Sequence, residues 1–172
     1  TLEGALKGRE FIAGDSFTAA DLYVGSHLGW GMSFGAVEKR PVFEAYVKEK
    51  RLEKRVRFHP GNFFNEALPA TDVLIMGHIL HDWNLDEKIM LLQKAYDALP
   101  PNGALIIYEA LIDDARKGNA FGLLMSLNML IETPGGFDFT GADCCKWMKA
   151  VGFKRAKVEQ LAGPDAMVVG YK

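Results

Sequence analysis

The sequence predicts an α/β chain preceded by a short all-helical segment. Two apolar runs, 73–77 and 104–108, are separated by a stretch with helical spacing, which is the alternation expected of an α/β fold. Up to about residue 50 the pattern is helical only. Between these parts, seven of the eight residues in 48–55 are charged, a shift in composition that suits a linker or a solvated helix end. We therefore expect two parts, 1–52 and 53–172.

The helical segment contains a helix start with a clear mechanism. Thr18 can accept a hydrogen bond from a free backbone N–H of the first turn, and Asp21 can accept one from the Thr18 N–H, which together make a capping box. Pro41 suits the first turn of a further helix. The apolar face of that helix is predicted to contain Val42, Phe43, Tyr46 and Val47. Thr18 and Asp21 are therefore interpreted as structural residues.

From residue 53 onward, strands and helices alternate. The predicted strands are 56–59, 72–77, 104–108, 153–161 and 166–171. The predicted helices are one that follows the capping residue Asn84, then 119–132 and 141–150. The buried stripe of the first of these helices is predicted to be Leu85, Ile89, Leu92, Tyr96 and Leu99. The last two strands flank a turn at Gly163, Pro164 and Asp165, which predicts a strand–turn–strand end to the chain.

The run 73–77 leads directly into the strongest candidate for a functional site. Its apolar residues suit a central strand covered on both faces, and Gly77 allows another group to approach the backbone closely. His78, His81, Asp82 and Trp83 follow at once. In open parallel sheets, ligands bind beyond the carboxyl ends of the strands, where these side chains would lie. A buried structural His81 at the start of a helix fits the same pattern, and the residues alone leave both interpretations open.

Composition limits the possible partners. The formal net charge is −2, which favours neither nucleic acid nor an anionic membrane, and no apolar run is long enough to span a bilayer. The only two cysteines, Cys144 and Cys145, are adjacent and are expected to stay reduced, which indicates the cytoplasm. If strand 73–77 lacks a neighbour, its free edge would promote association. We therefore expect helices over that edge or a homo-oligomer.

Seven landmarks occur in order between residues 55 and 172. They are RVRFHPGNFF (55–64), LPATDVL (68–74), LHDW (80–83), ALPPNGALIIYE (98–109), LNML (127–130), PGG (134–136) and VGF (151–153). This order resembles the later part of the catalytic domain of S-adenosylmethionine-dependent O-methyltransferases of the caffeate and hydroxyindole type. The resemblance implies a partial Rossmann-like class I methyltransferase sheet that ends in an antiparallel hairpin. It also implies methyl transfer to a hydroxyl or phenol of a small molecule.

The resemblance assigns site residues as well. His81 matches the catalytic histidine, Glu109 matches one flanking acid, and Asp138 matches the second, where the family usually has Glu. The cofactor-binding positions would be Gly61, Asn62, Phe63, Met76, Gly77 and Trp83. The acceptor pocket would include Met129 and Thr133. A histidine is a suitable general base for deprotonating a hydroxyl, and a carboxylate can orient its ring. No metal is implied.

One element of the family pattern is missing from the sequence. No Gly-x-Gly-x-Gly turn follows an early strand, and the acid that binds the ribose is not found either. We therefore expect this chain alone to bind S-adenosylmethionine weakly. Residues 11–23 and 40–46 resemble the C-terminal helical domain of glutathione transferases. The alternative function is accordingly a non-catalytic helical and α/β interaction module, or a glutathione-transferase-like fragment.

Overall fold

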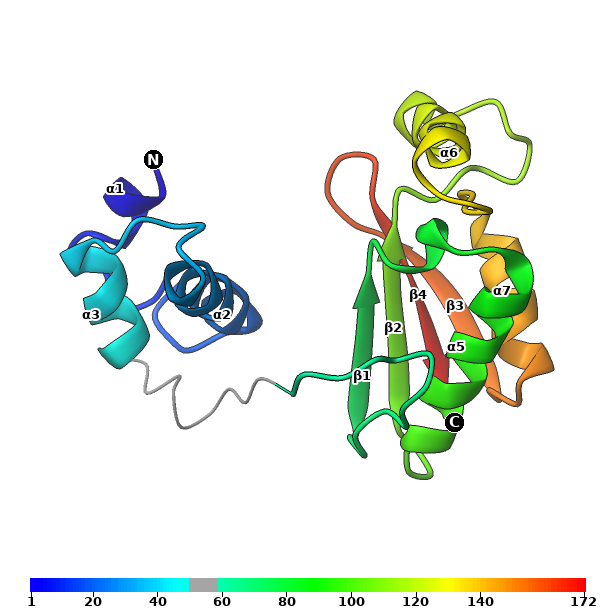
Figure 1. The fold of residues 1–172 in the computed structure, drawn as a ribbon, viewed down its shortest axis with the longest axis horizontal. Coiled ribbons are helices and arrows are strands. Elements are labelled where there is room, and N and C mark those ends of the chain that lie inside the picture. The colour runs from blue at the N-terminus through cyan, green and yellow to red at the C-terminus, as the bar shows by residue number, and fades with distance from the viewer. Residues whose placement is uncertain (50–58) are drawn as a thin grey trace. The chain divides into compact units, whose positions relative to one another are not determined.

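The computed structural model describes residues 1–49 and 59–172. The chain divides into two compact units, Thr1–Pro60 and Gly61–Lys172, which are drawn in blue to cyan and in green to red in Figure 1. The expected boundary near residue 52 and all but the last residue of the predicted strand 56–59 lie outside the described residues.

The first unit is helical, as predicted. It contains α1 (Leu2–Leu6), α2 (Ala19–Ser33) and α3 (Pro41–Glu49), and its described residues form no strand. The predicted capping box at Thr18 and Asp21 is confirmed. The buried core of this unit consists of Leu6, Leu28, Met32, Phe43 and Tyr46. Phe43 and Tyr46 lie on the face of α3 for which the sequence predicted burial.

The second unit is an α/β layer built on four strands. Its elements are β1 (Val73–Gly77), η1 (Leu80–Asp82), α5 (Leu85–Ala98), β2 (Ala104–Glu109), α6 (Ala120–Glu132), α7 (Gly141–Ala150), β3 (Arg155–Gln160) and β4 (Ala166–Tyr171). The strand order is β1-β2-β4-β3. Strands β1 and β2 are parallel, whereas β4 is antiparallel to both β2 and β3. The fold class predicted from the sequence, including the terminal hairpin, is confirmed.

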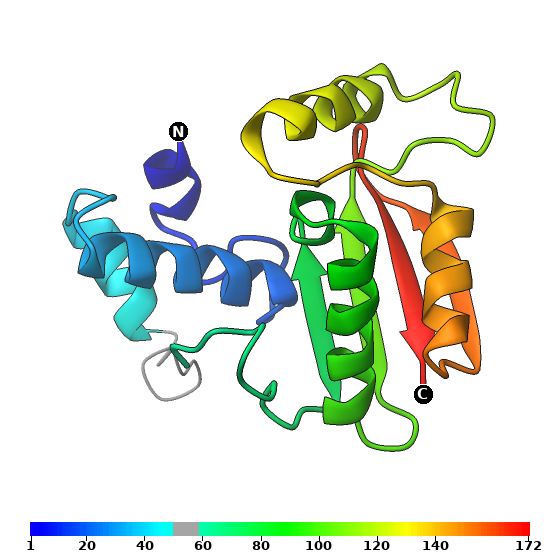
Figure 2. The same ribbon diagram turned by 45° about the vertical axis from the view of Figure 1, so that its right-hand side comes forward.

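Helices α5 and α7 cover one face of this sheet, which Figures 1 and 2 show from two directions. The core between the layers includes Leu91, Leu92, Leu105, Ile107, Met148 and Val168. Cys144 is buried on α7 and Cys145 is half-buried beside it, and both are free thiols. The carboxyl ends of β1 and β2 lie next to the loop that carries η1 and next to the segment that follows α6.

Two details of the predicted burial were wrong. Leu85 is 43% exposed, and Lys88 is completely buried on α5 in its place. Strand β1 is not covered on both faces, since Val73 and Ile75 are 48% and 61% exposed. Within the described residues β1 is the edge strand of the sheet, and β2 is the one strand that pairs with it.

Candidate active site

Three of the residues implied by the family resemblance meet at the carboxyl ends of β1 and β2. His81 lies in η1, Glu109 is the last residue of β2, and Asp138 lies between α6 and α7. The Nδ1 atom of His81 is 3.0 Å from Oε2 of Glu109 and 3.5 Å from Oδ1 of Asp138. All three residues are buried, with exposures of 7%, 1% and 2%. Parallel pairing of β1 with β2 causes this meeting, because it brings two strand ends to the same edge of the sheet.

Glu109 holds the loop that carries the histidine. Its Oε1 atom accepts hydrogen bonds from the backbone N–H groups of Ile79 and Leu80, at 3.1 and 3.0 Å. These bonds fix the first turn of η1, and they leave Oε2 directed at the imidazole of His81. One carboxylate therefore positions both the backbone and the ring of the candidate base.

The centre combines burial with unpaired polar atoms. Nδ1 of His81, Oε2 of Glu109 and both carboxylate oxygens of Asp138 are buried without a hydrogen-bond partner in the described part of the chain. Ion-pair distances join them, but the angles are not those of hydrogen bonds. Asp138 and then Glu109 stabilise the imidazolium and raise the pKa of His81 from 6.5 to about 10, against the opposing effect of burial. Such a concentration of charge is typical of functional sites.

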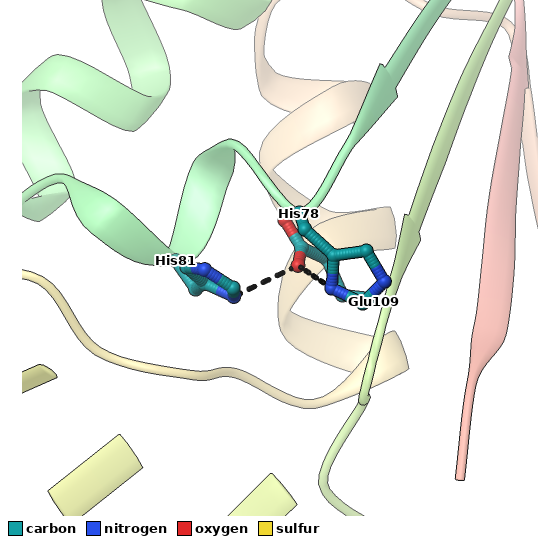
Figure 3. Close-up of side chains that lie close together, drawn as sticks. All are labelled: His78, His81 and Glu109. Atoms are coloured by element: carbon teal, nitrogen blue, oxygen red, sulfur yellow. Dashed lines mark ion pairs between the residues drawn. The ribbon is translucent and has the colours of Figure 1, made fainter. Parts of the chain in front are cut away.

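The other nitrogen of His81 faces outward. Nε2 lies 3.2 Å from Oδ1 of Asp82, whose side chain is 36% exposed. His78 stands next to this pair, with Nδ1 3.5 Å from Oε2 of Glu109 (Figure 3). Its backbone has a φ of 51°, in the left-handed region, and its N–H donates to the carbonyl of Tyr108. The sequence identified His78 as a neighbour of the site but assigned it no role.

Lys88 is a site neighbour that the sequence analysis missed. Its ammonium donates a hydrogen bond to the carbonyl of Trp83 and lies 3.6 Å from the ring centroid of Phe137. Burial lowers the pKa of Lys88 to about 8, although the negative charges of Glu109 and Asp138 oppose that effect. This lysine therefore joins α5 to the segment that carries Asp138.

An aromatic cluster lies where the resemblance expects the cofactor. The rings of Phe63 and Phe64 both meet Trp83 edge-on, with centroid distances of 5.9 and 4.5 Å. The indole Nε1 of Trp83 is buried and has no hydrogen-bond partner among the residues described. Asn62 uses its Oδ1 to accept from the N–H of Phe64 at 2.9 Å, so this oxygen stabilises a turn. Gly61 precedes that turn and is exposed.

Met76 and Gly77 end strand β1 beneath this cluster. Met76 is 8% exposed and belongs to the core. A Cβ added at Gly77 would lie 1.9 Å from the ring of Tyr108, so the close approach predicted at this glycine is made by a side chain of the same unit. The face of Gly77 toward Tyr108 is consequently filled, and a ligand would meet this residue only from another side.

Met129 and Thr133, the two predicted acceptor residues, lie on or just after α6. Met129 is 2% exposed. The hydroxyl of Thr133 donates to the carbonyl of Met129 at 2.9 Å and accepts from the N–H of Gly136 at 2.7 Å. Gly136 in turn packs on the backbone of His81, since an added Cβ would lie 2.5 Å from its carbonyl oxygen. Thr133 thus shapes the loop beside the centre.

Comparisons with known proteins agree with this architecture. Residues 40–154 match the family model of the O-methyltransferase domain. The tetracenomycin polyketide synthesis 8-O-methyl transferase TcmO of Streptomyces glaucescens is 38% identical over 139 residues, which are 81% of this chain and 41% of that protein. Acetylserotonin O-methyltransferase of Gallus gallus is 34% identical over 73% of this chain and 37% of its own length.

Solved structures show the same fold. Human N-acetylserotonin methyltransferase, in complex with SAM, superposes with a TM-score of 0.66 at 28% identity, covering 87% of this chain and 45% of that one. PigF with SAH also has a TM-score of 0.66, at 26% identity, over 87% of this chain and 48% of its own. The fold is therefore that of class I methyltransferases.

The chain belongs to the O-methyltransferase domain family. It spans about four tenths of the length of the curated relatives that it matches. The family model begins at residue 40 and so includes α3, whereas the glutathione-transferase resemblance of residues 11–23 and 40–46 finds no support in these comparisons. Among the described helices, none is both long and apolar enough to cross a membrane.

Proposed function

We propose that this chain serves S-adenosylmethionine-dependent methyl transfer to a hydroxyl group of a small aromatic molecule, with His81 as the general base. The observation that carries the proposal is the buried centre of His81, Glu109 and Asp138 at the ends of two parallel strands, where the charged atoms lie within ion-pair distance but form no hydrogen bond. A protein with no catalytic function would be more stable if these buried polar groups were hydrogen-bonded or replaced by apolar side chains. Membership of the O-methyltransferase domain family supports this reading.

His81 would take the proton of the acceptor hydroxyl on Nε2, which is its outward-facing nitrogen. Nδ1 keeps its own N–H throughout, on the side of Glu109 and Asp138, whose negative charges stabilise the imidazolium that forms. When bound, the cofactor supplies an electrophilic methyl group on a sulfonium. Only neutral His81 can accept a proton, and its pKa of about 10 favours the charged form at neutral pH. The proton-accepting fraction, and with it the rate, should therefore rise with pH through the neutral range.

The cofactor would be held by the aromatic cluster and the end of β1. The unpaired indole N–H of Trp83 and the rings of Phe63 and Phe64 suit a polar heteroaromatic group such as adenine. Met76 would lie beside the cofactor, with Gly61, Asn62 and Gly77 supplying backbone at its edge. Met129 and Thr133 would line the acceptor side, in keeping with their place next to the loop that faces His81.

The acceptor class rests on the relatives. One is named for 8-O-methylation in tetracenomycin polyketide synthesis, another for acetylserotonin, and a third for 3-hydroxy-5-methyl-1-naphthoate. All three names describe O-methylation of small molecules. We infer an acceptor of that class for this chain, and a reducing compartment such as the cytoplasm because both thiols are free. We infer a homo-oligomer because β1 is the edge strand of the described sheet.

We expect the isolated chain to bind the cofactor only weakly. The sequence contains no glycine-rich turn after an early strand and no acid in the position that would bind the ribose. Each polar group of the cofactor that is buried without a hydrogen-bond partner weakens the binding free energy by roughly 1–3 kcal/mol. About 1.4 kcal/mol corresponds to a tenfold change in affinity. Two or three such groups at about 1.4 kcal/mol each would raise a micromolar dissociation constant to the submillimolar or millimolar range, which a titration to millimolar concentration still detects.

The test is an NMR titration of this chain with S-adenosylhomocysteine up to millimolar concentration. The chain has three tryptophans, and the proposal predicts that the indole N–H signal of Trp83 moves, whereas those of Trp30 on α2 and Trp147 on α7 stay in place. If no signal of the second unit shifts, the non-catalytic interaction module is the better reading. A dissociation constant at or below the micromolar range, measured by calorimetry, would overturn the expected weakness.

A further inference from the structure

Two histidines and one carboxylate converge on a single point beside the candidate base. One ring nitrogen of His78, one ring nitrogen of His81 and a carboxylate oxygen of Glu109 all lie within 4.8 Å of one another. Figure 3 shows the three side chains, which come from the end of β1, from η1 and from the end of β2. Oε2 of Glu109 is 3.5 Å from His78 and 3.0 Å from His81. Methyl transfer as proposed here uses His81 and Glu109 and leaves His78 unexplained.

The spacing matches the ligand shell of a transition metal. Zinc binds imidazole nitrogen and carboxylate oxygen at about 2.0–2.2 Å, so two ligand atoms of a tetrahedral site are about 3.3 Å apart. The two distances to Oε2 of Glu109 lie on either side of this value. Nδ1 of His81 and Oε2 of Glu109 are both buried and have no hydrogen-bond partner in the described ranges, so both are available to bind a third atom.

Each histidine also has an outer carboxylate on its second nitrogen. Nε2 of His78 lies 3.6 Å from Oδ2 of Asp165, and Nε2 of His81 lies 3.2 Å from Oδ1 of Asp82. Histidines that bind metals almost always donate their other ring N–H to a carboxylate or carbonyl, because that contact fixes the tautomer and strengthens the ligand. Both rings therefore present Nδ1 inward and Nε2 outward, as a metal site requires.

The backbone at His78 supports the same interpretation. Its φ of 51° is uncommon for a residue with a side chain, although histidine tolerates this region better than most. The conformation is held by the hydrogen bond from its N–H to the carbonyl of Tyr108 at 3.0 Å. Strain of this kind occurs most often at ligand and active sites.

We propose that His78, His81 and Glu109 form a binding site for a divalent transition-metal ion of the zinc class, with Asp165 and Asp82 as the outer partners of the two histidines. Asp138 adds a further negative charge beside His81 and favours a cation there. Nδ1 of His81 would bind the ion in place of the proton that this nitrogen carries in the methyl-transfer mechanism. Inhibition of methyl transfer by the ion follows from this, and that consequence alone rests on the proposed function.

The test is calorimetric titration of the untagged chain with Zn²⁺, together with the visible absorption of bound Co²⁺, neither of which requires methyl transfer. We expect one ion per chain and a Co²⁺ spectrum of tetrahedral type. Asp165→Asn should weaken Zn²⁺ binding about 10- to 100-fold, as the loss of an outer partner usually does. His78→Gln should weaken it further, because a ligand is lost. His78 is 42% exposed, so this variant is expected to fold, and circular dichroism checks that it does.

Matched controls distinguish this site from other metal-binding groups. His27→Gln removes an exposed histidine of α2, and Cys145→Ser removes the half-buried thiol of α7. Neither should change the affinity for Zn²⁺. The proposal is overturned if His78→Gln binds Zn²⁺ as tightly as the unchanged chain, or if a control substitution abolishes binding. A chain that binds Zn²⁺ as expected but shows no Trp83 shift with S-adenosylhomocysteine would contradict the proposed function and leave the metal site standing.

Discussion

Both units contain buried carboxylates, but the hydrogen bonding of these carboxylates differs between the units. Asp21 in the helical unit is completely buried, and four groups donate to it: the N–H groups of Ile12 and Thr18 and the hydroxyls of Thr18 and Tyr46. Despite the opposing effect of burial, these bonds, led by that of Tyr46, lower the pKa of Asp21 to about 2. In the α/β unit, Asp138 is equally buried and neither of its oxygens has a hydrogen-bond partner among the described residues.

This difference separates a folding element from the candidate active site. A buried carboxylate with every oxygen satisfied stabilises the structure around it, as the capping box at Thr18 does. An unsatisfied buried carboxylate costs stability, and such a cost is tolerated where the group acts on something else. Burial of charge alone would not have distinguished the two regions.

The largest effect is expected from His81→Gln. In any preparation of this chain that transfers methyl groups, the rate should fall about 10²- to 10⁴-fold, which is the usual contribution of a general base. The affinity for S-adenosylhomocysteine should change little, because the replaced ring is not part of the aromatic cluster. His27→Gln is the matched control in the other unit. Turnover that survives the change at His81 would remove this residue from the mechanism.

Asp21→Asn should produce the largest loss of stability. The amide nitrogen of asparagine cannot accept a hydrogen bond, so at least one buried donor among Ile12, Thr18 and Tyr46 loses its partner. The expected cost is about 3 kcal/mol, at the upper end of the range for an unsatisfied buried group. Urea denaturation followed by circular dichroism would measure it. A change smaller than that of an ordinary surface substitution would mean that the capping box is dispensable.

Asp138→Asn should have a much smaller effect on stability. The replacement has nearly the same shape and removes a buried charge that has no hydrogen bond to lose. Above pH 10, where His81 is neutral and no ion pair with it is lost, we expect the free energy of unfolding to change by about 1 kcal/mol or less, in either direction, with Asp21→Asn measured under the same conditions. A loss as large as that of Asp21→Asn would show that Asp138 is a structural carboxylate after all.

Much of this picture could be predicted from local sequence. The capping boxes at Thr18 and Asn84 depend on residues three positions apart, and the strands at 72–77, 104–108 and 166–171 on short apolar runs, and these were confirmed. Placing His81 and Glu109 together came from the family resemblance, and the rule that parallel strands end at one edge of a sheet agrees with it. What could not be predicted depended on distant partners. Lys88 is buried because Phe137 and the Trp83 carbonyl surround its ammonium, and no spacing within α5 reveals that.

His78 illustrates the same limit. Its contact with Asp165 joins the residue just after β1 to the β3–β4 turn, and only the completed sheet brings these two segments together. The exposed face of β1, at Val73 and Ile75, was likewise invisible in its own apolar sequence, because coverage of a strand is decided by which other elements pack against it.

The most direct test of the unpaired centre is the titration of the His81 ring by NMR in this chain. We predict a pKa near 10 for His81. In Asp138→Asn the pKa of His81 should be lower, because the carboxylate that stabilises the imidazolium most is lost. Since the folded pKa is raised above the unfolded value of 6.5, this group stabilises the fold fully below pH 6.5. That stabilisation should disappear as the pH rises toward 10. An ordinary pKa near 6.5, unchanged in Asp138→Asn, would contradict the claim that the two buried carboxylates act on His81.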